Sequence, residues 1–119
     1  MGAMLVHASH GKEDPEKATL PFIFAKNGAL AGQDVTVILT SDAVWLATHG
    51  GAEGVQGEGL PPTADALREL LEAGATVWAC QTCTKPRGIT EEDLVEGARI
   101  GTSMQVVEVL AQGAAGMSF

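Results

Sequence analysis

The residues best suited to chemistry in this sequence are two cysteines, Cys80 and Cys83, which lie three positions apart. The thiolate is the reactive form of cysteine, and cations or a helix N-terminus nearby lower the pKa of a thiol. Lys85 and Arg87 follow closely and are two of only seven basic residues. Positive charge beside the thiols favours a thiolate and an anionic sulfur adduct. The simpler interpretation is a pair of small buried residues at a strand end, since free cysteine is often buried.

Two other kinds of site fit the same cysteines. His7 and His10 repeat the spacing of the cysteine pair, and two cysteines with two histidines suffice for a tetrahedral zinc site. The pair also has the spacing of a thioredoxin-like redox centre. Such a motif normally opens a long helix, whereas Pro86 and Gly88 follow here almost at once. Zinc binding and thiol–disulfide exchange are therefore alternatives to chemistry on a single thiolate.

Short apolar segments predict the strands that position these residues. Residues 4–7, 35–39, 75–79 and 116–119 each have the length and composition of a buried strand. Polar and proline signals predict helix starts between them, at Asp14-Pro15, Ser41 or Asp42, Thr63, Thr90, and Thr102 or Ser103. Pro21 interrupts the first helix, which is either kinked there or begins only at Thr19. The glycine-rich residues 49–62 predict a long mobile loop or lid.

The alternation of strands and helices predicts a parallel sheet covered on both faces. Ligands bind to such sheets outside the carboxyl ends of the strands. Residues 7–11, 40–42 and 80–88 all fall at that edge. We therefore expect a pocket there in which His7, Ser9, His10 and Asp42 lie near the cysteines.

Composition limits the class of protein. The chain has 119 residues, which predicts a single domain over residues 1–119, and its formal charge of −8 argues against nucleic acid and anionic membranes as partners. No apolar run approaches the roughly 18 residues that a membrane span needs. We see no signal peptide, so we expect a cytoplasmic protein whose thiols are kept reduced.

The sequence resembles the DsrE/DsrF-like family of small sulfur-handling proteins over nearly its whole length. The most specific stretch is residues 77–89, in which a strand runs into Cys80 and Arg87-Gly88 follows seven and eight positions later. Residues 31–35 resemble the family's link into its second strand, and residues 97–100 and the apolar helix to Leu110 also fit.

The resemblance implies a flavodoxin-like three-layer sandwich with a mostly parallel sheet of about five strands. It implies a sulfurtransferase-like carrier that holds sulfane sulfur as a persulfide on Cys80, takes it from a donor protein and passes it to an acceptor thiol, with no bound cofactor. Arg87 is the family's charge-stabilising residue, and Lys85 is expected to assist it. Relay members have a single cysteine, whereas Cys83 is present here and could release sulfide by attacking the persulfide, so a redox role stays open.

The family also implies assembly as homotrimers or homohexamers. The composition agrees, because 45% of the residues are hydrophobic and only 18% are charged. A domain this small has a limited core and few charges to cover its surface. Burial of an apolar patch between subunits would extend the small core and reduce the surface that charged residues have to cover. The remaining alternative is an oligomeric interaction protein with an inert cysteine pair.

Overall fold

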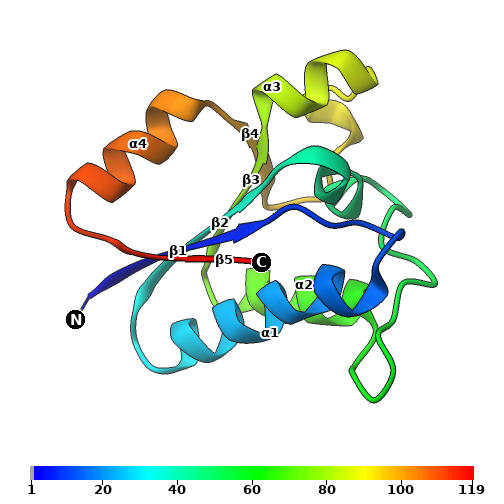
Figure 1. Ribbon diagram of the computed structural model, residues 1–119, viewed down its shortest axis with the longest axis horizontal. Coiled ribbons are helices and arrows are strands. Elements are labelled where there is room, and N and C mark those ends of the chain that lie inside the picture. The colour runs from blue at the N-terminus through cyan, green and yellow to red at the C-terminus, as the bar shows by residue number, and fades with distance from the viewer. Residues whose placement is uncertain (1) are drawn as a thin grey trace.

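The computed structural model describes residues 2–119 and has a five-stranded sheet in the order β4-β3-β2-β1-β5, with every neighbouring pair parallel (Figure 1). The strands are β1 (Ala3–Ala8), β2 (Asp34–Leu39), β3 (Thr76–Cys80), β4 (Ala98–Gly101) and β5 (Ala115–Ser118). The α-helices are α1 (Pro15–Leu30), α2 (Thr63–Glu72), α3 (Gln81–Thr84) and α4 (Ser103–Ala111). Three short 3-10 helices are η1 (Ser41–Ala47), η2 (Lys85–Arg87) and η3 (Glu91–Asp93).

The hydrophobic core lies between the sheet and the pair α1 and α2, which run side by side on one face (Figure 1). Side chains alternate between the two faces of a strand. Val6 and Ala8, Val37 and Leu39, and Val77 and Ala79 therefore all point into this core. The intervening residues His7, Ile38 and Cys80 face the opposite layer, which contains α4. The predicted three-layer α/β architecture is confirmed.

Helix α1 begins at Pro15 and runs without a break through Pro21, so the predicted start at Asp14-Pro15 is confirmed and the alternative start at Thr19 is wrong. Asp14 is the N-cap, and its carboxylate accepts a hydrogen bond from the Lys17 amide at 3.1 Å. Thr19 instead donates its hydroxyl to the Pro15 carbonyl at 2.7 Å, which is the back-bonding typical of threonine inside a helix. The same hydroxyl lies 2.7 Å from that of Thr63, which joins α1 to the start of α2.

Several predicted helix starts differ from the structure. Thr40, and not Ser41 or Asp42, is the N-cap of η1, and Pro62 is the N-cap of α2, so Thr63 is the first residue of that helix. The capping box at Thr90 is present, but it opens only the three-residue η3. Thr102 caps α4 as predicted. The sequence pattern missed β4, because Ala98–Gly101 is only four residues long and includes an arginine and a glycine.

The glycine-rich segment 49–62 is held against the domain and is not a free lid. Ala52 and Val55 insert into the hydrophobic core, each with 5% exposure. The Val55 carbonyl accepts a hydrogen bond from the Thr63 amide at 2.9 Å. Gly51 passes so close to η1 that a Cβ there would lie 1.7 Å from the Trp45 carbonyl oxygen. Only glycine fits that contact without a backbone shift.

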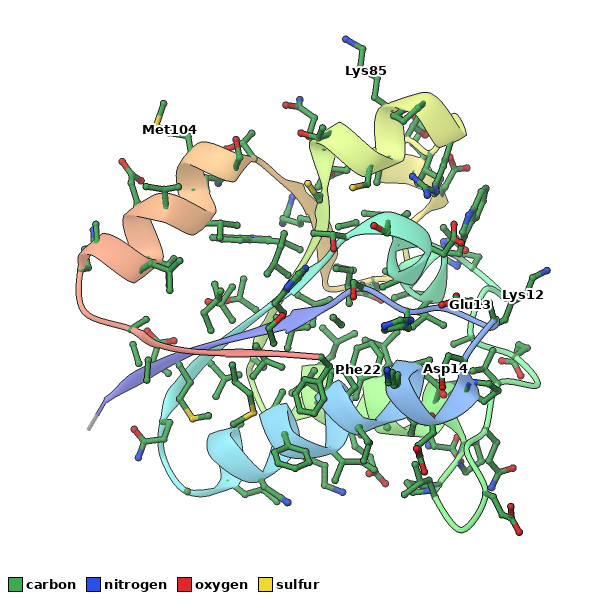
Figure 2. All side chains as sticks on the ribbon, in the orientation of Figure 1. Lys12, Glu13, Asp14, Phe22, Lys85 and Met104 are labelled. Carbon is green, nitrogen blue, oxygen red and sulfur yellow. The ribbon has the colours of Figure 1, made fainter. Side chains whose placement is uncertain are left out.

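Helix α4 covers the second face of the sheet incompletely. None of its residues is buried, and Met104, Val107 and Leu110 are 70%, 60% and 42% exposed. Figure 2 shows Met104 pointing outward from the molecule. Strand β5, the edge strand next to this helix, is also exposed along its length. In residues 2–119 no helix has the length and apolar character needed to cross a membrane.

Candidate functional site

The parallel register brings the predicted segments to one edge of the sheet. His7 pairs with Ile38 of β2 and with Ser118 of β5, and Leu39 pairs with Ala79 of β3. Thr40 and Cys80 each follow one of these paired residues, so they come next to each other at the carboxyl ends of β2 and β3. The expectation that these strand ends meet at one edge is therefore confirmed.

Cys80 lines a cavity of about 430 Å³ between the sheet and α4. It is the last residue of β3 and the N-cap of α3, and its side chain is partly exposed. The cavity wall is mostly apolar, with Leu5, Ile38, Val106, Val107, Leu110 and Met117, and its polar side chains are His7, Thr40, Ser103 and Ser118. The thiol therefore opens onto a pocket that a small sulfur species can enter.

Cys83 has different surroundings. It is the third residue of α3, partly buried, and it packs against the hydrophobic core rather than lining the Cys80 cavity. One helical turn separates the two thiols, yet they face different environments. Cys80 is therefore open to a ligand in the cavity and Cys83 is not, a difference that the spacing of the two cysteines did not predict.

The two predicted cations do not line the Cys80 cavity. Arg87 donates to the Asp42 carboxylate at 3.1 Å and to the Cys83 carbonyl at 3.0 Å, so its guanidinium braces η1 against α3. Lys85 is exposed and extends away from the domain (Figure 2). Arg87 thus contacts the backbone of one cysteine residue, Lys85 is exposed, and neither lines the Cys80 cavity.

His7 lies between two hydroxyl groups. Its Nδ1 is 2.8 Å from Ser118 Oγ and its Nε2 is 2.7 Å from Thr40 Oγ1. Burial lowers the pKa of His7 below its ordinary value, because desolvation disfavours the charged imidazolium. The imidazole is therefore neutral at neutral pH, and it joins β5, β1 and β2 at the cavity floor.

This pKa shift makes stability depend on pH in a defined direction. The unfolded chain binds a proton at His7 near pH 6.5, whereas the folded chain binds it only at lower pH, so acidification below about 6.5 favours unfolding. The stabilising contribution of neutral His7 is fully present above about pH 6.5, and it is lost as the pH falls through the lowered pKa of His7 in the folded chain. We expect His7→Gln to weaken the loss of stability between about pH 7.5 and pH 5.5, measured by urea unfolding. An equal loss in both proteins would contradict this.

The four residues of the zinc alternative do not come together. His10 Nδ1 lies 3.0 Å from the Glu13 carboxylate. The neighbouring Ser9, which is not one of the four, donates a hydrogen bond to the Phe119 carbonyl at 2.9 Å. Within the described residues, no three His, Cys, Asp or Glu side chains form a group that could hold a metal ion. Of the four predicted ligands, only His7 and Cys80 line the same cavity.

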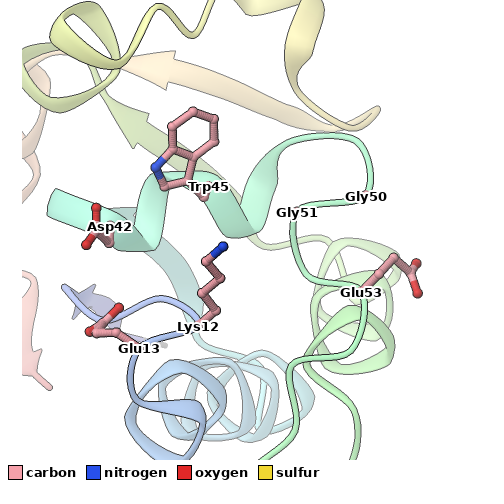
Figure 3. Close-up of a pocket in the computed structure, with 7 residues that line it drawn as sticks. All are labelled: Lys12, Glu13, Asp42, Trp45, Gly50, Gly51 and Glu53. Atoms are coloured by element: carbon pink, nitrogen blue, oxygen red, sulfur yellow. The ribbon is translucent and has the colours of Figure 1, made fainter.

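A second cavity, of about 490 Å³, lies beside the glycine-rich segment and contains neither cysteine. Lys12, Glu13, Asp42, Trp45 and Glu53 line it together with Gly50 and Gly51. Figure 3 shows the Lys12 side chain directed toward Trp45, while Glu53 points away from both. The predicted pocket of His7, Ser9, His10 and Asp42 is thus divided: His7 lines the Cys80 cavity, Asp42 lines this second one, and Ser9 and His10 line neither.

Comparison with known proteins agrees with this architecture. The model of the DsrE/DsrF-like family matches residues 3–119. The chain belongs to the DsrE/DsrF-like family. It is 34% identical over 92 residues to an uncharacterised protein of Methanopyrus kandleri, covering 77% of this chain and 73% of that protein. An uncharacterised protein of Methanocaldococcus jannaschii is 33% identical over 104 residues, which cover 87% of this chain and 85% of the relative.

Solved structures show the same DsrE/DsrF-like fold. The crystal structure of the YchN protein from E. coli matches all of both chains with a TM-score of 0.85 and 25% sequence identity. A protein of unknown function from Methanobacterium thermoautotrophicum also matches all of both chains, with a TM-score of 0.78 and 18% identity. At that lower identity the match supports the fold alone.

In this member of the DsrE/DsrF-like family, Ser118 is a cavity residue that the sequence did not predict, and Thr40, although predicted at this edge, was given no role there. Thr40 directly follows a strand, so its place at the edge was predictable, but its contact with His7 was not. Ser118 belongs to a predicted strand, but a sequence does not say that this strand lies beside the first one. The strand order β4-β3-β2-β1-β5 supplies that information, because it places β5 beside β1.

Proposed function

We propose that this protein is a sulfur carrier that holds sulfane sulfur as a persulfide on Cys80. The observation that carries the proposal is the position of Cys80 at the carboxyl edge of the sheet, partly exposed and open to a cavity of about 430 Å³. Membership of the DsrE/DsrF-like family supports it, because this family is associated with sulfur-relay proteins. The partners of such a carrier are a sulfur donor and an acceptor thiol.

The proposed reaction consists of two nucleophilic displacements on sulfur. The Cys80 thiolate attacks the outer sulfur of a donor persulfide, a sulfur–sulfur bond forms on Cys80, and the donor thiolate leaves. An acceptor thiolate then attacks the outer sulfur of the Cys80 persulfide, and the Cys80 thiolate leaves. The sulfur atom moves with no net oxidation or reduction, so the transfer requires an accessible thiolate and no redox partner.

Loading and unloading of the wild-type protein test this function. After treatment with inorganic polysulfide and desalting, the intact mass should rise by one sulfur atom. A small thiol such as cysteine should then return the protein to its starting mass and acquire the sulfur as its own persulfide. A protein that gains no sulfur, or gains sulfur that no thiol can remove, would contradict the carrier role.

We also propose that the exposed face formed by α4 and β5 is covered by further copies of the chain, in a trimer or a hexamer as the family resemblance implies. Met104, Val107, Leu110 and Met117 are exposed large apolar side chains on these two elements, and the last three also line the Cys80 cavity. Apolar side chains gathered in this way on one face commonly mark a protein interface. The edge position of β5 leaves backbone groups open on the same side.

A charge on this face should break the assembly. We expect Val107→Glu to shift the protein toward a monomer in gel filtration, because an interface would have to bury the new carboxylate without a partner. Leu30→Glu is the matched control: Leu30 is 70% exposed and Val107 60%, but Leu30 lies at the end of α1 on the other side of the sheet. Equal effects of both changes, or a monomeric wild type, would contradict an interface at α4.

A further inference from the structure

Three polar side chains form a hydrogen-bonded row at the carboxyl ends of neighbouring strands. Ser118 of β5, His7 of β1 and Thr40 after β2 are joined through the two ring nitrogens of the histidine, at 2.8 Å and 2.7 Å. We call these three residues the polar row. All three line the Cys80 cavity, so the row runs across its floor toward β3.

The polar row ends beside Cys80. Leu39 pairs with Ala79, so the next residues along the two strands, Thr40 and Cys80, stand side by side and share one face of the sheet. A persulfide adds one sulfur–sulfur bond, about 2 Å, beyond the cysteine Sγ. The outer sulfur would therefore extend into the cavity in the neighbourhood of the Thr40 hydroxyl.

The rest of the cavity has few side chains that could bind an anion. Its remaining wall is apolar apart from Ser103, and no lysine or arginine lines it. Of the two predicted cations, Arg87 is held by the Asp42 carboxylate and the Cys83 carbonyl. An anion in apolar surroundings needs hydrogen-bond donors to replace its lost water. Among the side chains of the Cys80 cavity, such donors are supplied by the polar row and Ser103.

The polar row has two proton arrangements. With the proton on Nδ1, His7 donates to Ser118, and the Thr40 hydroxyl must donate to Nε2. With the proton on Nε2, Ser118 donates to Nδ1 and His7 donates to Thr40, which frees the Thr40 hydroxyl hydrogen. Only the second arrangement lets Thr40 donate to a sulfur atom in the cavity.

We propose that the polar row is the binding subsite for the outer, anionic sulfur of the Cys80 persulfide, with hydrogen bonds directed from Ser118 through His7 and Thr40 to that sulfur. This inference rests on the proposed carrier function and adds positioning residues to it. No proton passes to or from the sulfur: Ser118 and Thr40 keep their hydroxyl hydrogens, and His7 stays neutral with its single ring proton on Nε2. Burial keeps the imidazole neutral at neutral pH, as the lowered pKa of His7 indicates.

The first test is the equilibrium of sulfur exchange between Cys80 and glutathione persulfide, measured by intact mass in a Cys83→Ser parent. We expect Thr40→Val to lower the ratio of loaded to unloaded protein by roughly tenfold to a hundredfold, because it removes a hydrogen bond to a charged group. Thr40→Ser keeps the hydroxyl and should stay within about threefold of the parent. An unchanged ratio in Thr40→Val would overturn the inference and leave the carrier function standing.

The second test reads the proton position directly and needs no substitution of Thr40. The chain has three histidines, so the His7 signals in a ¹⁵N spectrum can be assigned by their absence in His7→Gln. We expect the loaded protein to hold the proton on Nε2 of His7. A loaded protein with the proton on Nδ1 would overturn the inference even if Thr40→Val failed to fold. A parent protein that takes up no sulfur would overturn the carrier function and this inference with it.

Discussion

Cys80→Ser should lose sulfur loading almost completely, with the mass gain after polysulfide treatment falling by roughly a hundredfold or more. A serine hydroxyl is not a thiolate at neutral pH and cannot attack sulfane sulfur at a comparable rate. The change removes no core side chain, because Cys80 is only partly buried at the edge of the cavity. The fold should therefore persist, and intact-mass spectrometry of the folded variant measures the effect.

Cys83→Ser is the matched control for this experiment, since it makes the same atomic change three residues away. Cys83 packs against the core and does not line the cavity, so loading at Cys80 should remain. We also expect the persulfide to last longer in this variant. Attack of the Cys83 thiolate on the inner sulfur of the Cys80 persulfide would form a disulfide and release hydrosulfide, and the substitution removes that route.

The two variants together separate the carrier from its alternatives. Equal loading in Cys80→Ser and wild type would contradict the carrier role of Cys80. Release of sulfide from wild type before an acceptor thiol can take up the sulfur, with a disulfide left between Cys80 and Cys83, would instead favour thiol–disulfide exchange. Cys83 lies one helical turn after Cys80, so a disulfide between the two cysteines is the product to look for in that case.

Phe22→Ala should destabilise the fold by about 3–5 kcal/mol, the usual cost of removing a fully buried phenylalanine. Phe22 is 0% exposed and belongs to the core between α1 and the sheet. A domain of this size has a total stability of about 5–15 kcal/mol, so the change removes a large part of it. Urea unfolding at neutral pH measures the effect.

Phe24→Ala is the control on the same helix. Phe24 is 44% exposed and touches Phe119 edge to face, with ring centroids 5.1 Å apart. Its removal should cost about 0.5–1.5 kcal/mol, the contribution typical of an aromatic pair. Both changes replace phenylalanine by alanine in the same helix and alter helix propensity equally. The difference between their free energies of unfolding therefore reports how deeply each phenylalanine is buried. Equal destabilisation by the two changes would contradict the packing of α1 on the sheet.

Most of the fold could be predicted because its elements have strong local signals. Residues 35–39 are a continuous apolar and β-branched run and form β2. The caps at Asp14 and Thr102 satisfy free backbone amides, a requirement that is readable from sequence. Strand β4 lacked such a signal because its pairing with β3, and not its own composition, makes it a strand.

The site could be predicted only in part, because distances across a sheet depend on strand order. The cysteines were found from their spacing, and their place at the sheet edge followed from the alternation of strands and helices. The polar row could not be found in this way, since His7 and Ser118 are 111 positions apart. The ion pair between Arg87 and Asp42 was also not predicted, because the two residues are 45 positions apart and counting charges does not show which of them pair.

The most direct test of the central claim is to locate the added sulfur in the wild-type protein by fragmentation mass spectrometry. Cys80 and Cys83 receive the same polysulfide treatment in the same molecule, so each is the internal control for the other. The cavity position of Cys80 and the core packing of Cys83 predict that the extra sulfur lies on Cys80. Sulfur found mainly on Cys83, or equally on both cysteines, would contradict the account.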